Sequence, residues 1–350
     1  MSITKKSSLP DLTAPSAVAW WLLTMAIMVL AMAVIGAITR LTESGLSITE
    51  WLPIAGAIPP MTEEAWEVAL EKYRQIPEYQ EVNKGMSLEA FKNIYWWEYI
   101  HRLWGRLLGL AFTVPMVWFW AKGKLPTALK PHVLVLFALG ALQGYIGWWM
   151  VKSGLSGRVD VSQYRLAVHL GIAVVIFAHS FWLFMRIKFD ETPAGPLESF
   201  RLTNKVIVWL IFLSIIMGAF VAGMNAGLAY NTWPRMDGQW VPAGLFVMSP
   251  WLVNFFENAL TVQFIHRWVA QVAVVLIFVF GIWVLRSKPN KKLKIAVIHL
   301  LIMAFVQLSL GIKTLMFGVP IPLAALHQMG AFLLLACSLW TLYRLPRTMA

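Results

Sequence analysis

Four of the seven histidines lie within long apolar stretches of the chain. A polar side chain in the hydrocarbon layer of a membrane costs free energy, so its presence there indicates a function. Two neutral imidazoles on neighbouring helices can bind a haem iron from its two faces. The spacing therefore predicts two bis-histidine haem sites, one for each consecutive pair. The four residues are His101, His169, His266 and His327.

The residues beside these histidines are small. Position i+4 lies on the same helix face as position i, and after each histidine it holds glycine or alanine, which suits a flat porphyrin. Small residues also let membrane helices pack closely, and that alternative would explain any single helix. A planar cofactor accounts better for four helices that each present a histidine at a matching depth. The positions are Gly105, Ala173, Ala270 and Ala331.

The other three histidines receive a structural interpretation. His132 and His299 lie at the starts of apolar stretches and are expected at the membrane interface. His179 follows His169 by ten residues, which rotates it by about 80° around a helix. It therefore cannot share an iron with His169, and we expect it to be hydrogen-bonded within the bundle.

Arginines directly follow two of the four histidines, as Arg102 after His101 and Arg267 after His266. A guanidinium is a planar fork suited to the carboxylates of haem propionates. Arginines near helix ends also extend to the membrane surface, which is the alternative. Both interpretations stay open.

One acid distinguishes the two predicted sites. Glu98 lies three residues before His101, and the matching position in the second half is Gln263. A carboxyl group beside a reactive centre can transfer protons. An ion pair with Arg102 or Arg106 is the structural alternative. The difference predicts different roles for the two sites.

The composition identifies a polytopic membrane protein. Of the 350 residues, 59% are hydrophobic and 13% are charged, against about 25% charged in an average globular protein. The single cysteine, Cys337, cannot close a disulfide within the chain. An extracellular disulfide scaffold and a disordered chain are excluded. We interpret the net charge of +12 as a signal for membrane topology and anionic lipid, not for nucleic acid.

Eight apolar stretches are long enough for a transmembrane helix, which needs about 20 residues. Lysine and arginine gather on one side of them, which the positive-inside rule places in the cytoplasm. Both termini are then cytoplasmic, the haem pockets lie toward the periplasmic side, and a bacterial plasma membrane is the expected location. The predicted spans are Ala17–Ile38, Tyr95–Trp120, His132–Val151, Arg165–Met185, Lys205–Met224, Ala259–Leu285, Lys294–Met316 and Leu323–Tyr343.

The second half of the chain repeats the first. Each half has four spans, so both halves begin on the same side of the membrane, which predicts parallel repeats about an axis along the membrane normal. The predicted fold is all-α, with eight transmembrane helices in two parallel-repeat four-helix bundles. The pairs that match are Gly36 with Gly218, Trp51 with Trp233, His101 with His266, Gln143 with Gln307, Gly147 with Gly311, and His169 with His327.

These observations predict a domain organisation with two outer loops in which no helix is evident. Long loops of this kind are often functional. The expected parts are a cytoplasmic tail (1–16), an N-terminal bundle (17–187) with an outer loop (40–93), a cytoplasmic linker (188–204), a C-terminal bundle (205–344) with an outer loop (225–257), and a cytoplasmic tail (345–350).

The sequence resembles the haem A synthase family over nearly its whole length. The similar segments are Gly36–Ser47, Glu98–Arg102 and Tyr230–Pro234, together with the paired histidines of the second half. The segment Trp51–Pro60 is similar to the branch shared by alphaproteobacteria and mitochondria. Some members carry a cysteine pair in the first outer loop, and this chain has none there, which argues against a thiol–disulfide step.

The resemblance implies oxidation of a methyl group of haem O to a formyl group, which gives haem A for cytochrome c oxidase. It implies that His266 and His327 hold a resident haem b. His101 and His169 then face the substrate haem O, with Glu98 in the catalytic neighbourhood. Haem O synthase, cytochrome c oxidase assembly factors, an unidentified electron donor or acceptor and a homo-oligomer are the suggested partners.

Two other functions use the same features. A dihaem cytochrome b that relays electrons from quinol would need the four histidines but no unique acid, so Glu98 speaks against it. A transporter would explain the internal repeat but would bind no haem. Haem extraction distinguishes all three.

Overall fold

The computed structural model describes residue 12, residues 14–190 and residues 197–346 of the chain. Eight helices in this described part are long and apolar enough to cross a membrane, which confirms the predicted all-α membrane fold. The predicted tails (1–16 and 345–350) and the predicted linker (188–204) fall partly outside the described residues.

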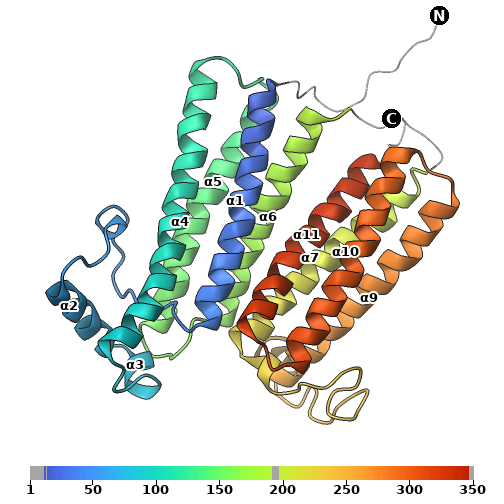
Figure 1. The fold of residues 1–350 in the computed structure, drawn as a ribbon. Coiled ribbons are helices and arrows are strands. Elements are labelled where there is room, and N and C mark those ends of the chain that lie inside the picture. Colours follow the sequence, from blue (N-terminus) through green and yellow to red (C-terminus); the bar gives the residue numbers. More distant parts are fainter. Residues whose placement is uncertain (1–11, 13, 191–196, 347–350) are drawn as a thin grey trace, which may run out of the picture.

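Each half of the chain contributes four of the long helices (Figure 1). The end at which α1 finishes is the one predicted to face outward, and it is called the outer end below. In the first half the helices are α1 (Ser16–Leu41), α4 (Leu88–Ala121), α5 (Lys130–Gly154) and α6 (Gln163–Lys188). In the second half they are α7 (Phe200–Gly223), α9 (Ala259–Arg286), α10 (Lys291–Met316) and α11 (Ile321–Arg344).

The helices of the two halves pack in matching pairs. In the first half α1 packs against α4 and α6, and α5 packs against α6. In the second half α7 packs against α9 and α11, and α10 packs against α11. Between the halves, α1 contacts α11 as α6 contacts α7. This arrangement is consistent with the predicted parallel repeat.

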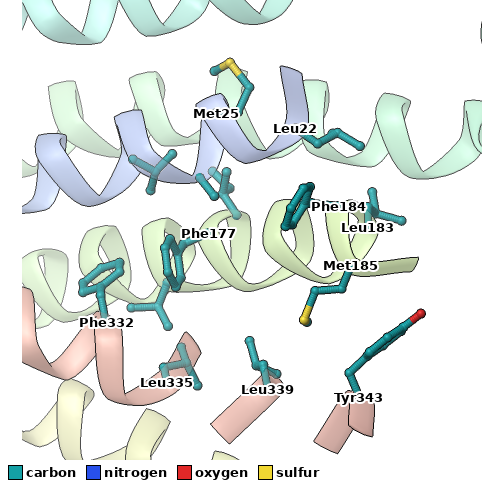
Figure 2. Close-up of a cluster of buried hydrophobic side chains, with 14 of the residues drawn as sticks. Leu22, Met25, Phe177, Leu183, Phe184, Met185, Phe332, Leu335, Leu339 and Tyr343 are labelled. Carbon is teal, nitrogen blue, oxygen red and sulfur yellow. The ribbon is translucent and has the colours of Figure 1, made fainter. Parts of the chain in front are cut away.

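The largest hydrophobic core joins the two halves. Figure 2 shows Met25 of α1, Phe177 of α6 and Phe332 of α11 within this cluster. The rings of Phe177 and Phe332 meet edge to face with centroids 5.2 Å apart. Both side chains are buried, so the core holds the bundles together on their inner sides.

The first outer loop is partly helical, which corrects the expectation of a loop without helices. It contains η1 (Ala55–Ala57), α2 (Glu63–Arg74) and α3 (Pro77–Glu81). Thr62 accepts a hydrogen bond from the Ala65 amide and so caps α2, as N-cap threonines do. The second outer loop contains only the short η2 (Ala226–Leu228), η3 (Trp251–Val253) and α8 (Asn254–Glu257).

Helix α4 begins earlier than predicted, at Leu88 instead of Tyr95. The Ser87 hydroxyl accepts from the Ala90 amide at 3.2 Å and caps the helix. The added turns carry Phe91, which is fully buried in a cluster with α2 residues such as Trp66. Helix α4 therefore anchors the outer loop to the first bundle.

Candidate functional site

Each of the four predicted histidines packs against a glycine of a neighbouring long helix. A β-carbon added at any of these glycines would lie close to an imidazole ring atom, so a larger residue would displace the ring. The distances from the added carbon are 3.1 Å for Gly36 and His101, 3.1 Å for Gly147 and His169, 3.2 Å for Gly218 and His266, and 2.9 Å for Gly311 and His327.

The hydrogen bond of His266 determines which ring nitrogen is free. Its Nδ1 lies 3.0 Å from the backbone oxygen of Ser214, one turn before Gly218. A carbonyl oxygen only accepts, so Nδ1 carries the proton and Nε2 keeps its lone pair. Metal-binding histidines are commonly oriented in this way. His266 is therefore arranged to bind a metal through Nε2.

Two glutamines hold the histidine-bearing helices α6 and α11 in the same manner. Gln143 donates to the backbone oxygen of His169 at 2.9 Å. Gln307 donates to the backbone oxygen of His327 at 3.0 Å. Gln143 and Gln307 are a pair that the sequence repeat had matched, so the internal repeat extends to individual hydrogen bonds.

Within each half the two histidines lie in electrostatic range of each other, His101 with His169 and His266 with His327. Nδ1 of His169 is buried and has no hydrogen-bond partner in the described part of the chain. No group of three or more His, Cys, Asp or Glu in the described chain is placed to hold a metal ion. A histidine pair supplies two ligands, so an iron bound there would take the rest from a porphyrin. The paired imidazoles and their glycines fit a haem.

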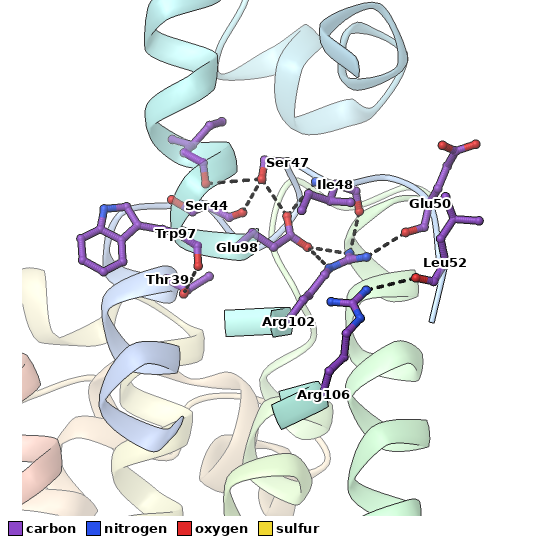
Figure 3. A network of polar contacts seen from close by, with 11 residues as sticks. Thr39, Ser44, Ser47, Ile48, Glu50, Leu52, Trp97, Glu98, Arg102 and Arg106 are labelled. Atoms are coloured by element: carbon purple, nitrogen blue, oxygen red, sulfur yellow. Dashed lines mark hydrogen bonds and ion pairs between the residues drawn. The ribbon is translucent and has the colours of Figure 1, made fainter. Parts of the chain in front are cut away.

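Glu98 is buried and forms four hydrogen bonds at the outer end of α4 (Figure 3). It accepts from the Ser47 hydroxyl and from the Ile48 amide, both at 2.7 Å. It also accepts twice from Arg102, at 2.6 and 3.0 Å. Of the two ion pairs considered for it, the one with Arg102 is present.

Arg102 and Arg267 both fasten the outer loop of their own half. Arg102 donates to the backbone oxygens of Ile48 and Glu50 at 2.6 and 2.7 Å. Arg267 donates to the backbone oxygen of Thr232 at 2.8 Å. Thr232 follows Glu50 by the repeat offset of 182, so the two clamps are equivalent. One terminal nitrogen of Arg267 is buried without a partner among the residues that the structure describes, and its predicted propionate contact stays a prediction.

The matched residues Glu98 and Gln263 bind the loop through opposite chemistry. Gln263 donates its amide to the backbone oxygen of Tyr230 at 3.2 Å, whereas Glu98 accepts from the backbone amide of Ile48. Tyr230 follows Ile48 by the same offset. The first half thus has an acceptor where the second half has a donor.

The sequence did not indicate several contacts of the site. Arg106 donates to the backbone oxygens of Leu52 and Pro53 at 3.0 and 2.9 Å, and extends the clamp of the first loop. The rings of His132 and His179, which were interpreted separately, lie together with centroids 5.3 Å apart. Backbone oxygens leave no mark in a sequence, so the loop contacts could not be found from it.

Arg40 connects the two halves at the outer end. It donates to the backbone oxygen of Ala222 at 3.2 Å and to the Asn225 side chain at 3.1 Å. It also lies 3.5 Å from the carboxylate of Asp160. Ala222 is the repeat partner of Arg40, so the second half has no equivalent arginine at this position.

Comparisons with known proteins place the chain in a family. A profile described as cytochrome oxidase assembly protein matches residues 19–339. A protein of Rhodospirillum centenum, named haem A synthase, is 51% identical over 336 residues, which cover 95% of this chain and 89% of that protein. A protein of the same name from Parvibaculum lavamentivorans is 49% identical, over 95% of this chain and 95% of that protein. Another from Nitrosospira multiformis is 44% identical, over 99% of this chain and 100% of that protein.

The chain belongs to the haem A synthase family. The resemblance predicted from the segments around Gly36, Glu98 and Tyr230 is therefore confirmed.

Proposed function

We propose that the chain is an oxidoreductase that converts haem O into haem A by oxidising a methyl group to a formyl group. The proposal follows the family, whose members are named haem A synthase. The observation that links the proposal to particular residues is the duplicated histidine pair, which has an acid beside it only in the first half. Glu98 lies on the helix of His101, and Gln263 lies in its place on the helix of His266.

We assign the second pair, His266 and His327, to a resident haem b. The Nδ1 proton of His266 is fixed by Ser214, and the backbone of His327 is fixed by Gln307. A cofactor that stays in place needs ligands held in this way. Arg267, whose Nη1 is buried with no hydrogen-bond partner among the described residues, is assigned to a propionate of that haem.

We assign the first pair, His101 and His169, to the substrate haem O. When bound, the haem iron supplies the redox chemistry, and the protein supplies ligands, orientation and charge. Glu98 is the proton-accepting group next to this pair, and Ser47 and Ile48 hold its Oε2 while Arg102 holds its Oε1. Arg102 donates both to Glu98 and to the loop, so we assign it to positioning Glu98, and its propionate contact stays a prediction.

The proposed location is the bacterial plasma membrane, with both termini in the cytoplasm and both histidine pairs toward the periplasm. The basic connections between α4 and α5 and between α9 and α10 lie at the end opposite the outer loops (Figure 1). The partners suggested by the resemblance, including haem O synthase, cytochrome c oxidase assembly factors and a second copy of the chain, stay predictions.

Chromatography of the extracted pigments tests the proposal. Protein purified from cells that make haem O should yield haem b together with haem O or haem A. Two equivalents of haem b with no other haem would overturn it in favour of an electron relay, and a protein without any haem would overturn both.

A further inference from the structure

The two halves differ in how closely one pair of matching helices packs. In the second half α9 and α10 pack against each other more extensively than the matching helices α4 and α5 do in the first half. Within the apolar 18-residue segment of each helix, 11% of the residues are buried in α4 and in α5, against 28% in α9 and 22% in α10. The first bundle is therefore open on the side where the second is closed.

Glycines mark this open side. Gly109 of α4 and Gly140 and Gly144 of α5 have no atom within 4 Å of where a β-carbon would stand. Glycine in membrane helices commonly permits close packing, but these three pack against nothing. The matching positions of the second half are Val274, Ala304 and Leu308, of which Val274 and Ala304 are 8% and 0% exposed.

The opening begins close to the first histidine pair and extends away from the outer end. Gly144 lies one turn before Gly147 on α5, and Gly109 lies about two turns beyond His101 on α4, rotated by about 80° around the helix. Gly140 precedes Gly147, the glycine against His169, by two turns on one face of α5. Toward the other end of the bundle the two helices meet again, where the rings of Phe112 and Phe137 stack with centroids 6.4 Å apart.

The rings of His169 and His327 differ in their contacts. Nδ1 of His169 is buried and has no hydrogen-bond partner among the described residues. In the second half, the ring of His327 contacts the side chain of Gln307 at 3.1 Å. The ring of His169 is therefore less constrained than its counterpart.

We propose that the space between α4 and α5 is a lateral doorway through which a haem dissolved in the bilayer reaches the first histidine pair and leaves again. This inference rests on the proposed function, because only a substrate pocket must exchange its haem. A macrocycle with a hydrocarbon periphery partitions into lipid, and the doorway faces the lipid. By the same argument, the close packing of α9 against α10 retains the resident haem.

The experiment fills the doorway with the residues of the closed half. The double variant Gly109→Val, Gly144→Leu is purified and placed in vesicles that contain haem b as the probe. Haem b replaces haem O because its uptake can be followed by absorbance without any oxidation. The expected result is uptake into the first pocket about tenfold slower than in the unaltered protein, with the same final occupancy and an intact resident haem.

Two controls separate a doorway from a general effect. Ala138 lies on the face of α5 opposite Gly147 and is exposed, so Ala138→Leu adds bulk facing lipid and should leave uptake unchanged. Val274→Gly with Leu308→Gly opens the second half and should speed the release of the resident haem.

A second design avoids any dependence on folding of the double variant. In a Cys337→Ser background, Gly144→Cys is folded first and then alkylated with a bulky maleimide, and uptake is compared before and after labelling. Slower uptake with unchanged occupancy supports the doorway.

Unchanged uptake rates in both designs would overturn the doorway and favour access from the outer aqueous side. Lost occupancy at an unchanged rate would also overturn it, because the glycines would then be part of the pocket wall. Absence of any uptake by the unaltered protein would instead contradict the assignment of His101 and His169.

Discussion

Gly311 and His327 form the tightest of the four glycine–histidine contacts, since a β-carbon at position 311 would lie 2.9 Å from Cε1 of the imidazole. Gly147 and His169 form the matching contact in the first half, at 3.1 Å. The chain thus uses the same device twice, with a glycine on one helix setting the depth and direction of a ring on the next.

Gly311→Val should expel the ring of His327 from its position. The expected result is loss of the resident haem b, with binding weakened by at least about tenfold because the overpacked ring cannot reach the iron. Absorbance of the purified protein measures this loss. Gly147→Val is the matched control, which should leave the resident haem in place and affect only the first pocket, and a normal resident haem in Gly311→Val would contradict the contact.

His266→Ala and His327→Ala should each abolish the resident haem b, whereas Glu98→Ala should keep it and lose haem A formation. The reason is that the acid lies only in the first half. Haem content and extracted haem A are measured for each variant. Normal haem A output from Glu98→Ala would refute the catalytic assignment.

Arg102→Gln separates the proton-accepting role of Glu98 from its role in fixing the loop. This variant loses the contacts to Ile48 and Glu50 but keeps the carboxylate. We expect haem A formation to fall by about tenfold, as for a positioning residue, whereas Glu98→Gln, which removes the carboxylate, should abolish it. Equal loss in both variants would show that Glu98 only fixes the loop.

The buried carboxyl group of Glu78 should make the stability of the outer helices α2 and α3 depend on pH. Burial, followed by the charges of Asp160, Glu43 and Glu98, raises the pKa of Glu78 to about 8. The unfolded chain has an ordinary pKa near 4.3, so between these values the folded protein holds a proton that the unfolded chain has released. The free energy of unfolding should therefore fall as the pH rises from about 4.3 to about 8.

Glu78→Gln keeps the neutral shape and should remove this dependence, making the outer helices roughly 2 kcal/mol more stable than in the unaltered protein at pH 9. Hydrogen exchange of α2 and α3 between pH 5 and pH 9 measures it. Glu67→Gln, at an exposed position of α2, is the control. A Glu78→Gln protein that loses protection with pH as the unaltered protein does would contradict the prediction.

Arg40→Ala should loosen the connection between the halves at the outer end. It removes hydrogen bonds to Ala222 and Asn225 and the ion pair with Asp160. Asp160 is 37% exposed, so solvent screens the ion pair, and we expect a loss of about 1–2 kcal/mol from the hydrogen bonds. Thermal unfolding measures it. A double-mutant cycle with Asp160→Asn should give coupling below about 1 kcal/mol, and a larger value would contradict this account.

The eight membrane spans could be predicted from the sequence, apart from the early start of α4, because they depend on local patterns. Apolar runs predict membrane helices directly, and His101, His169, His266 and His327 stand out as polar residues within such runs. Their glycine contacts could be expected only in part. The repeat matched Gly36 with Gly218 and Gly147 with Gly311, but only the packing of helices shows that each glycine faces a ring.

The contacts that hold the outer loops could not be predicted from the sequence, for a different reason. Arg102, Arg106 and Arg267 bind main-chain oxygens, and every residue type has such an oxygen. Helix α2 could have been predicted from the sequence. A capping residue and acids mark its start, and basic residues mark its end, which are ordinary helix signals; they are Thr62, Glu63, Glu64, Lys72 and Arg74. The pairing of His132 with His179 depends on the angle between α5 and α6, which no local pattern specifies.

The contacts of Arg106 have a consequence for the shape of the outer surface. The segment 51–61 has no charged residue, and its η1 turn rises beside α4 (Figure 1). Main-chain oxygens that leave water must find donors within the protein, and Arg106 serves Leu52 and Pro53 while Tyr99 serves Ala57 at 2.7 Å. The Arg106 guanidinium therefore holds a segment with exposed apolar side chains, such as Ile54 and Ile58, against the membrane-spanning helix α4.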